Sequence, residues 1–490
     1  MATYIPIDMP YYYLPFFICF IFAFLVHFFI KSYMKPKPSS QDPPSPPALP
    51  IIGHLHLIGS VLPKSFQTLA RRYGIPLMQL RLGAATCIVV SSAEVAREIF
   101  KTHDIIFSSR PEFGSSEHFI YRGSRFLLAP YGEYWRFMKK LCMNKLLAAP
   151  QLNLSVDIRA EEVANLVEKV TKRAREGQPC DLSSELTTLT NNTICRMLGA
   201  KLSVGDVLGP LKIFDFSGTA KKLGSVLQRF DGLVERIMKE HEGRSEVGEQ
   251  GRDLMDILLE IYRDPTSEVK LSRNDIKSFL LDIFMAGTDT SSAAMQWAMG
   301  ELLSHPQAYK KLREEIDMVV GVKRLVRESD IPNLPYLQAV IKETLRLHPS
   351  GPFIIRECGE DCKVYGSIVK AKARILINAY AIMRDADLWT DPDEFIPERF
   401  LDSSEEKIGE HQMELKGQNF RYVPFGSGRR GCPGASLAML VMHSTIAALV
   451  QCFDWKVKDG EKIDLELGSG FAAEMAKSLV IYPIARLNPY

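Results

Sequence analysis

The chain has 490 residues, of which 46% are hydrophobic and 24% are charged, a balance that excludes a mostly disordered or fibrous protein. Lysine and arginine number 60 and aspartate and glutamate 58, so the net charge of +2 offers no basic excess for binding nucleic acid. The nine scattered cysteines include no Cys-x-x-Cys pair, which argues against a disulfide scaffold and favours a reducing compartment.

Residues 11–30 carry no Asp, Glu, Lys or Arg. At about 1.5 Å per residue they are long enough to cover the ~30 Å hydrocarbon core of a bilayer, so a transmembrane anchor is predicted. The segment is long for a signal peptide, and lysines rather than a small-residue cleavage site follow it. Those lysines place the downstream chain in the cytosol and residues 1–10 in the lumen.

Residues 31–53 are basic and proline-rich, with five prolines between positions 43 and 50. Proline fixes φ and removes a hydrogen-bond donor, so a stiff, extended segment is expected. A proline-rich interaction motif is the alternative, but the position directly after the anchor favours a rigid hinge. Residues 54–490 are then predicted to form one undivided domain.

This domain is predicted to be mainly α-helical with small β-sheets, because helical periodicity dominates and strand-like runs are few. The predicted helices span residues 65–73, 93–102, 133–147, 157–176, 223–242, 253–262, 273–303, 306–319, 336–347 and 434–452. The predicted strands span residues 77–82, 87–91, 363–365 and 374–378.

A glycine-rich loop over residues 425–434 holds Cys432 directly before an apolar helix. The loop contains a Gly-x-Gly-x-x-Gly spacing, but the run before it ends in proline and no second βαβ unit follows, which argues against a dinucleotide site. A thiolate at Cys432 gains from the helix N-terminus and from backbone N–H groups that the glycines leave accessible. Arg430 adds positive charge. A large metallo-cofactor with acidic groups explains this pattern better than a merely buried cysteine.

Phe425, Gly428, Arg430, Cys432 and Gly434 form an FxxGxRxCxG pattern that resembles the haem-binding loop of the cytochrome P450 family. The resemblance covers essentially the whole chain and implies the cytochrome P450 fold. It implies that Cys432 is the axial thiolate ligand of the iron in haem b, and that Arg430 contacts a haem propionate. It also implies a single-pass protein of the endoplasmic reticulum membrane with its catalytic domain in the cytosol.

Residues 286–291, with the sequence AGTDTS, resemble the oxygen-activation stretch of the family's central helix. Ala286 and Thr290 are four residues apart and share a helix face. The small Ala286 and Gly287 are expected to leave space on the distal side of the haem. The Thr290 hydroxyl and the Asp289 carboxylate are suited, with water, to relay protons. A Ser/Thr-rich face that bonds to its own helix carbonyls is the alternative.

Glu343 and Arg346 match the ExxR motif of the family, and their spacing brings them together on one helix face. Arg399, in the sequence FIPERF, resembles the PERF segment and is expected to join them in a buried network. Such a network contributes shape more than net stability, because burying charges is costly. An isolated ExxR is usually a surface ion pair, and only the other motifs favour the buried arrangement.

Trp135 begins a WRFMK sequence that resembles the WxxxR motif, whose members contact a haem propionate. Lys139 stands where the motif has arginine, and lysine offers a point charge instead of a bidentate fork. Arg136 is the alternative propionate ligand. Arg356 resembles a further propionate arginine of the family.

The resemblance implies a haem-thiolate monooxygenase that uses O2. Since the chain has no flavin or nicotinamide site, its electrons are expected from NADPH through a separate reductase. Candidates for the reductase-docking face are Lys139, Lys140, Arg421 and Arg429. The alternatives are a haem-thiolate isomerase or dehydratase that does not use O2, and a non-catalytic, membrane-tethered haem protein. The Asp289–Thr290 pair argues against both.

The motifs look closest to plant microsomal branches that oxidise flavonoids and triterpenoids. The substrate pocket that the resemblance implies is apolar and aromatic, and it includes Phe119, Phe214, Phe284, Phe353, Ile354 and Phe471. Such walls suit a rigid, lipophilic, polycyclic substrate. Ser115 and His118 are among the few groups able to address phenolic hydroxyls, which slightly favours a triterpenoid over a flavonoid.

Overall fold

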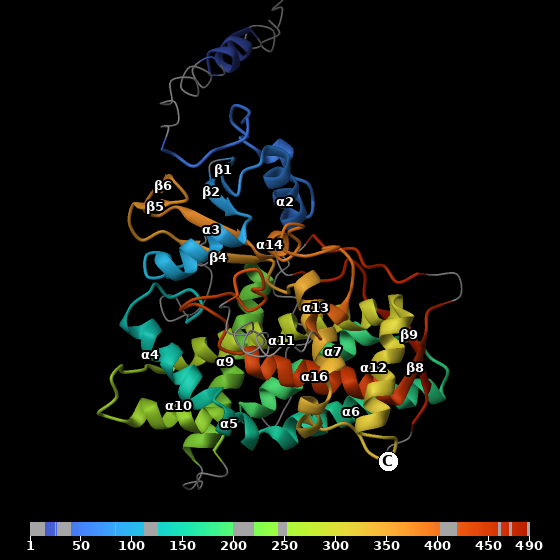
Figure 1. The fold of residues 1–490 in the computed structure, drawn as a ribbon. Helices are drawn as coiled ribbons and strands as arrows, with labels where there is room; N and C mark the ends of the chain where they lie inside the picture. The colour runs from blue at the N-terminus through green and yellow to red at the C-terminus, as the bar shows by residue number, and fades with distance from the viewer. Residues whose placement is uncertain are drawn as a thin grey trace, which may run out of the picture.

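The structure is a computed structural model, and it describes residues 15–24, 26, 41–83, 85–111, 126–198, 220–243, 252–401, 419–458, 462–469 and 473–487. Of residues 220–226 it describes the backbone alone. The prediction of a mainly helical domain with small sheets is confirmed (Figure 1).

A four-stranded sheet forms the upper lobe of the molecule (Figure 1). Its strands, in spatial order, are β1 (Leu77–Leu82), β2 (Ala85–Val90), β7 (Arg374–Asn378) and β4 (Phe353–Glu357). The inner pair β2 and β7 is parallel, while the outer pairs are antiparallel. The sheet therefore joins segments almost 290 residues apart, and β4 reaches from it towards the helical body.

Two smaller sheets complete the strands. One orders β3 (Cys180–Asp181), β9 (Val480–Ala485) and β8 (Phe453–Lys456), and the other pairs β5 (Cys362–Val364) with β6 (Ser367–Val369).

Helices make up the rest of the described body. The α-helices are α2 (Leu62–Tyr73), α3 (Ala93–Arg97), α4 (Glu133–Leu141), α5 (Ala149–Leu154), α6 (Val156–Arg175), α7 (Leu182–Met197), α9 (Ala220–Glu242), α10 (Leu254–Arg263), α11 (Arg273–Ser304), α12 (Pro306–Val319), α13 (Pro335–Leu347), α14 (Ala379–Ile382) and α16 (Ala435–Cys452). Short 3₁₀ segments are η1 (Leu55–Leu57), η6 (Glu328–Asn333) and η7 (Pro397–Phe400), and π-helical turns are η2 (Glu98–Thr102) and η4 (Cys142–Leu146). Most predicted elements are present with shifted ends. The α-helices and strands that were not predicted are α5, α7, α14, β3, β4, β6, β8 and β9.

The long helix α11 runs through the middle of the helical body (Figure 1). It begins at a capping box in which the Ser272 hydroxyl accepts a hydrogen bond from the Asp275 N–H and the Asp275 carboxylate accepts one from the Ser272 N–H. It has 32 residues and is therefore about 48 Å long at about 1.5 Å per residue. It packs against α7 and α16, so most of its faces are buried.

Among the described residues, one helix is long and apolar enough to cross a membrane, namely α16. Because 78% of it is buried inside the fold, it is explained as the central core helix of the body. Of the predicted anchor at residues 11–30, the structure describes the helix Pro15–Phe24, whose large apolar side chains are exposed.

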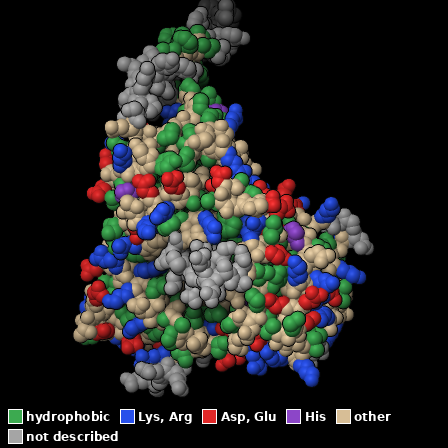
Figure 2. Space-filling view, viewed as in Figure 1, with side chains coloured by type: hydrophobic (Ala, Val, Ile, Leu, Met, Phe, Trp, Pro, Cys, Tyr) green, Lys and Arg blue, Asp and Glu red, His purple; other side chains and the backbone are tan. Residues whose placement is uncertain are grey.

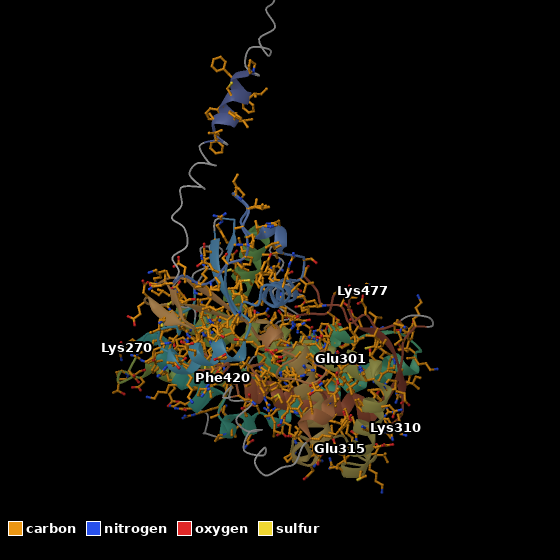
Figure 3. The ribbon with its side chains drawn as sticks, turned by 45° about the horizontal axis from the view of Figure 1, so that its top comes forward. Lys270, Glu301, Lys310, Glu315, Phe420 and Lys477 are labelled. Atoms are coloured by element: carbon orange, nitrogen blue, oxygen red, sulfur yellow. The ribbon has the colours of Figure 1, made fainter. Side chains whose placement is uncertain are left out.

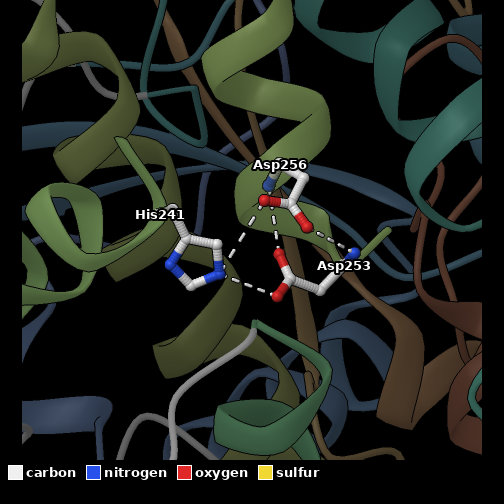
Figure 4. Close-up of side chains that lie close together, drawn as sticks. All are labelled: His241, Asp253 and Asp256. Carbon is white, nitrogen blue, oxygen red and sulfur yellow. Dashed lines mark hydrogen bonds and ion pairs between the residues drawn. The ribbon is translucent and has the colours of Figure 1, made fainter. Parts of the chain in front are cut away.

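A buried histidine fastens α9 to α10. His241 Nδ1 hydrogen-bonds to the Ile237 carbonyl, and its Nε2 lies 2.8 Å from Asp253 Oδ2 and 4.0 Å from Asp256 Oδ1 (Figure 4). The two aspartates cap the N-terminus of α10 reciprocally. By distance alone the three groups could ligate a metal ion, but their capping and ion-pair contacts already account for their positions. None of them lines the cavity described below.

All nine cysteines are free, and seven of them are buried. Cys19 and Cys432 are the exceptions, and the exposed surface of Cys432 faces an internal cavity. The absence of disulfides agrees with the expectation from the cysteine pattern.

Candidate active site

A cavity of about 420 Å³ lies where α4, α7, α11, β4 and the loop before α16 meet. Residues from distant parts of the chain converge on it, among them Arg110, Trp135, Thr290, Arg356 and Cys432. The cavity therefore brings together most of the residues that the sequence motifs singled out.

The loop before α16 presents the Cys432 thiol to the cavity. The Cys432 N–H donates to the Phe425 carbonyl at 2.9 Å, which closes the loop. Burial raises the pKa of the thiol, whereas hydrogen bonds from the Gly434 and Ala435 N–H groups and the charge of Lys139 act in the opposite direction. Both backbone donors come from the start of α16, so the helix N-terminus favours a thiolate.

Position 428 requires glycine for two reasons: its backbone conformation and the lack of space for a side chain. Its φ is +68°, in the left-handed region, and a Cβ there would lie 2.5 Å from Asp104 Oδ1. Asp104 in turn pairs with Arg429, at 3.1 Å between Oδ2 and Nε. The loop is thus held against the segment that carries Asp104.

Four cationic side chains line the cavity: Arg110, Lys139, Arg356 and Arg430. Burial lowers the pKa of each of them, that of Arg430 to about 9. Among the described lining residues, Asp282 is the only carboxylate. Arg110 Nε is buried and has no hydrogen-bond partner. A cavity wall with four positive groups and one negative group suits a ligand that carries two carboxylates.

Arg110 had not been predicted, because no motif surrounds it and only the fold brings it to the cavity. The other cations are held by backbone carbonyls. Arg430 Nε donates to Ser108 O at 2.6 Å, and its guanidinium stacks on Trp135 at 4.2 Å from the ring centroid.

Lys139 and Arg136 occupy different environments. Lys139 Nζ donates to the Gly431 carbonyl and lines the cavity. Arg136 is exposed, does not line the cavity, and stacks over Tyr131 at 5.7 Å from the ring centroid. Of the two alternatives, the geometry therefore favours Lys139 for contact with a ligand in the cavity.

Helix α11 forms the opposite wall. Thr290 Oγ1 donates to the Ala286 carbonyl at 2.6 Å, and Ser350 Oγ donates to the Thr290 carbonyl at 2.8 Å. Ala286 and Thr290 are both exposed to the cavity. Asp289 is half-buried and does not line it. Burial and the nearby Glu474 raise the pKa of Asp289 to about 6.

Gly287 has a packing role that had not been predicted. A Cβ at this position would lie 2.9 Å from Cδ1 of Ile194 on α7. The glycine therefore allows the two helices to approach closely, besides lining the cavity.

Glu343 and Arg346 on α13 form a fully buried, bidentate ion pair, with N–O distances of 2.7 and 2.8 Å and no side-chain exposure. Arg399 Nε donates to Glu343 Oε1 at 3.0 Å. The guanidinium of Arg346 also donates to the carbonyls of Met383, Pro392 and Glu394. The network thus ties α13 to the irregular segment that precedes the Cys432 loop.

Comparison with known proteins identifies the family. The family model described as Cytochrome P450 matches residues 43–206 and 203–479. The chain belongs to the cytochrome P450 family. This P450 is 41% identical to 3,9-dihydroxypterocarpan 6A-monooxygenase of Glycine max, over 95% of this chain and 98% of that protein. It is 39% identical to beta-amyrin 24-hydroxylase of Glycine max, over 99% of both chains.

A solved zebrafish cytochrome P450 with progesterone superposes on this P450 with a TM-score of 0.75. The sequences are 25% identical, and the match covers 86% of this chain and 99% of that chain. Like other members of the family, this P450 is a haem-thiolate oxidoreductase that uses O2 and electrons from NAD(P)H. The cavity fits haem, because it combines a thiol at a helix N-terminus with a cluster of cations and the unbonded Arg110 Nε.

The predicted substrate-pocket residues of this P450 divide into three groups. Phe353 and Ile354 line the cavity. Phe284 does not: it is 2% exposed and packs against Phe230 of α9, with 6.1 Å between ring centroids, so its assignment to the pocket is corrected. Phe119, Phe214 and Phe471 lie outside the described residues, as do Ser115 and His118.

Proposed function

We propose that this P450 inserts one oxygen atom from O2 into a lipophilic plant specialised metabolite of the triterpenoid or flavonoid type. Its electrons come from NADPH through a separate reductase. The observation that carries this proposal is the single cavity in which the Cys432 thiol, four cations and the Ala286–Thr290 face of α11 meet.

Each wall of the cavity has its own part in this proposal. Cys432 binds the haem iron, while Phe425 and Gly434 shape its loop. Two haem propionates are held by the cation cluster with Trp135, and Arg110 joins that set. When bound, haem supplies the oxidising chemistry that activates O2.

Exchanging Lys139 for methionine is expected to speed haem loss. A charge-assisted hydrogen bond contributes about 1.5–3 kcal/mol, which corresponds to roughly a 10- to 100-fold change in retention. The rate of haem loss is measured by following the transfer of haem to an excess of apomyoglobin. Arg136→Met is the matched control and should change the rate less than about twofold, because Arg136 does not face the cavity. A larger effect at Arg136 than at Lys139 would reverse the assignment.

Thr290 and Asp289 deliver protons in the proposed reaction. The Thr290 hydroxyl donates a hydrogen bond to the Ala286 carbonyl, so its lone pairs are left to accept a hydrogen bond from water in the cavity. Asp289, with a pKa of about 6, can gain and lose a proton near neutral pH. An isomerase or a purely haem-binding protein would have no use for this pair.

The variant Thr290→Ala should therefore uncouple the reaction. NADPH should still be oxidised, but hydrogen peroxide should rise and product per NADPH should fall by about 100-fold, the lower end of the contribution that general acid–base catalysis typically makes. Thr288→Ala is the control. The Thr288 hydroxyl donates an equivalent hydrogen bond, to the Phe284 carbonyl four residues earlier, but Thr288 does not line the cavity. Equal coupling in both variants would remove Thr290 from the relay.

The relatives support the substrate class. By their names, one relative hydroxylates beta-amyrin and another acts on a dihydroxypterocarpan. The cavity wall formed by Phe353, Ile354 and Leu437 is apolar and suits such polycyclic skeletons. Spectral titration of the ferric enzyme with beta-amyrin and with a flavanone tests the two classes. Tight binding of a small polar acid, and of neither skeleton, would overturn the proposal.

We further place the protein in the endoplasmic reticulum membrane, single-pass, with its catalytic domain in the cytosol. Besides the apolar helix Pro15–Phe24, exposed apolar side chains gather on the lobe nearest to it (Figure 2): Leu49, Ile51, Ile52, Leu55 and Leu62. Lipophilic substrates partition into the same membrane.

The reductase is proposed to dock on the side of the Cys432 loop. Lys140 and Arg429 are exposed there, paired with Glu268 and Asp104. Arg421 stacks over Trp389, and Lys139 is committed to the Gly431 carbonyl. NADPH-dependent O2 consumption in the presence of reductase and substrate would separate the monooxygenase from an isomerase and from a non-catalytic haem protein.

A further inference from the structure

Asp289 is half-buried on α11, outside the cavity and adjacent to Thr290, which lines it. Among the described residues, Glu474 is the only charged group that perturbs it. The nearest acidic groups on α11 are engaged elsewhere. Asp282 accepts from the Leu127 N–H at 2.9 Å, about two turns before Asp289. Glu301 accepts from His348 Nε2 at 2.6 Å, about three turns after it.

Glu474 belongs to a pair of antiparallel segments, residues 464–468 and 473–477, which we call the hairpin. The hairpin is attached to α11 through Trp297 and, by way of Ser350, through Thr290, the neighbour of Asp289. The Trp297 indole N–H donates to the Ala473 carbonyl at 2.7 Å. The Ala473 N–H donates to Ser350 O at 3.1 Å, and Ser350 Oγ donates to Thr290 O. An unbroken series of hydrogen bonds therefore joins the residue before Glu474 to the backbone of Thr290.

The hairpin has little freedom to move away. At Gly300 of α11 a Cβ would lie 3.0 Å from Leu465 and 3.5 Å from Met475, so both strands of the hairpin pack directly on the helix. The Gly468 N–H donates to Glu474 O, and Lys477 pairs with Asp464 at 3.0 Å. Figure 3 shows Lys477 at the edge of the body and Glu301 within it. The Glu474 side chain is itself exposed.

We propose that Glu474 is a positioning residue for proton uptake: it receives protons from solvent and passes them to Asp289, which supplies Thr290 and the cavity. This inference rests on the proposed monooxygenase function. The step is a proton transfer without electron transfer, in which a proton leaves water, binds a Glu474 oxygen, and moves to an Asp289 oxygen directly or through water.

The juxtaposition has a second effect. A negative charge on Glu474 opposes ionisation of Asp289, so it keeps a proton available on Asp289 near neutral pH. Since desolvation also raises the pKa of Asp289, removing Glu474 should lower that pKa without returning it to the ordinary value.

Glu474→Gln in the full-length, haem-loaded enzyme tests this inference. Infrared difference spectra across a pH titration report the carboxylic C=O stretch of protonated Asp289, which Asp289→Asn identifies. We expect the midpoint of this band to fall in Glu474→Gln. The pH at which product per NADPH is half-maximal should fall by the same amount, and Glu474→Asp should restore both.

Glu466→Gln is the matched control, because Glu466 is exposed on the same hairpin and does not act on Asp289. An unchanged infrared midpoint in Glu474→Gln would overturn the inference, as would an equal shift in Glu466→Gln. The infrared titration needs no turnover. A shifted midpoint in a protein that makes no oxygenated product would therefore contradict the proposed function but support the electrostatic coupling of Glu474 to Asp289.

Discussion

Replacement of Cys432 by alanine is expected to abolish both monooxygenase activity and the red-shifted absorption band of the reduced, CO-bound protein. That band reports a thiolate on the iron, and residues 425–434 contain no second sulfur. Haem held by the cation cluster alone would lack the electron donation that favours O–O cleavage. A CO difference spectrum measures the effect directly.

Cys452→Ala provides the control. Cys452 is the last residue of α16, the helix that follows the Cys432 loop, and at about 1.5 Å per residue it lies about 30 Å from Cys432. It should keep the band even if it costs some stability, because it removes a small buried side chain. A normal band in Cys432→Ala would contradict the assignment of the iron ligand.

Glu343→Ala is expected to leave almost no folded enzyme. The substitution leaves the buried guanidinium of Arg346 without its carboxylate and also deprives Arg399 of a partner. Breaking a buried pair on one side costs about 3–5 kcal/mol, a large part of the roughly 5–15 kcal/mol that stabilise a folded domain. The yield of haem-loaded protein and its resistance to urea measure the loss.

Glu314→Ala is the matched surface substitution. Glu314 pairs with Lys310 across one helical turn at 3.7 Å, but the two side chains are 62% and 71% exposed. Exposed pairs contribute at most about 1 kcal/mol, so this variant should fold normally. Comparable losses in the two variants would show that the buried network is not what stabilises α13.

Motifs whose members are close in sequence could be predicted, because helix geometry alone brings them together. Glu343 and Arg346 meet at a spacing of three, and Ala286 and Thr290 at a spacing of four. The Cys432 loop was recognisable because its glycines all lie within ten residues of the thiol, so the whole pattern is visible in one short stretch of sequence.

Contacts between distant segments could be predicted only where a family motif marks both partners, as for Arg399 and Glu343. Arg110 and Glu474 carry no local pattern and acquire their positions only from the fold. The pairing of β2 with β7 likewise has no signal in either strand. Helix α7 was missed because its threonines and asparagines are poor helix formers, and packing against α11 outweighs that preference.

The wrong placement of Phe284 has a related cause. α11 is buried on almost every side, so its sequence has no apolar stripe that would mark one face as the cavity wall. Only the position of α9 shows that Phe284 belongs to the packing between those helices.

The buried cysteines of this P450 are expected to react only slowly with the hydrogen peroxide that an uncoupled enzyme releases. Burial raises the pKa of Cys87 to about 11 and those of Cys142, Cys180, Cys358 and Cys452 to about 12. At pH 7 such thiols are ionised to at most about one part in ten thousand, and oxidants attack the thiolate. Of these five thiols only Cys142 lines the cavity, so hydrogen peroxide released by an uncoupled turnover meets one protonated thiol there and the other four lie away from it in the core. We therefore expect haem and the iron ligand, not these cysteines, to be the first targets of self-inactivation.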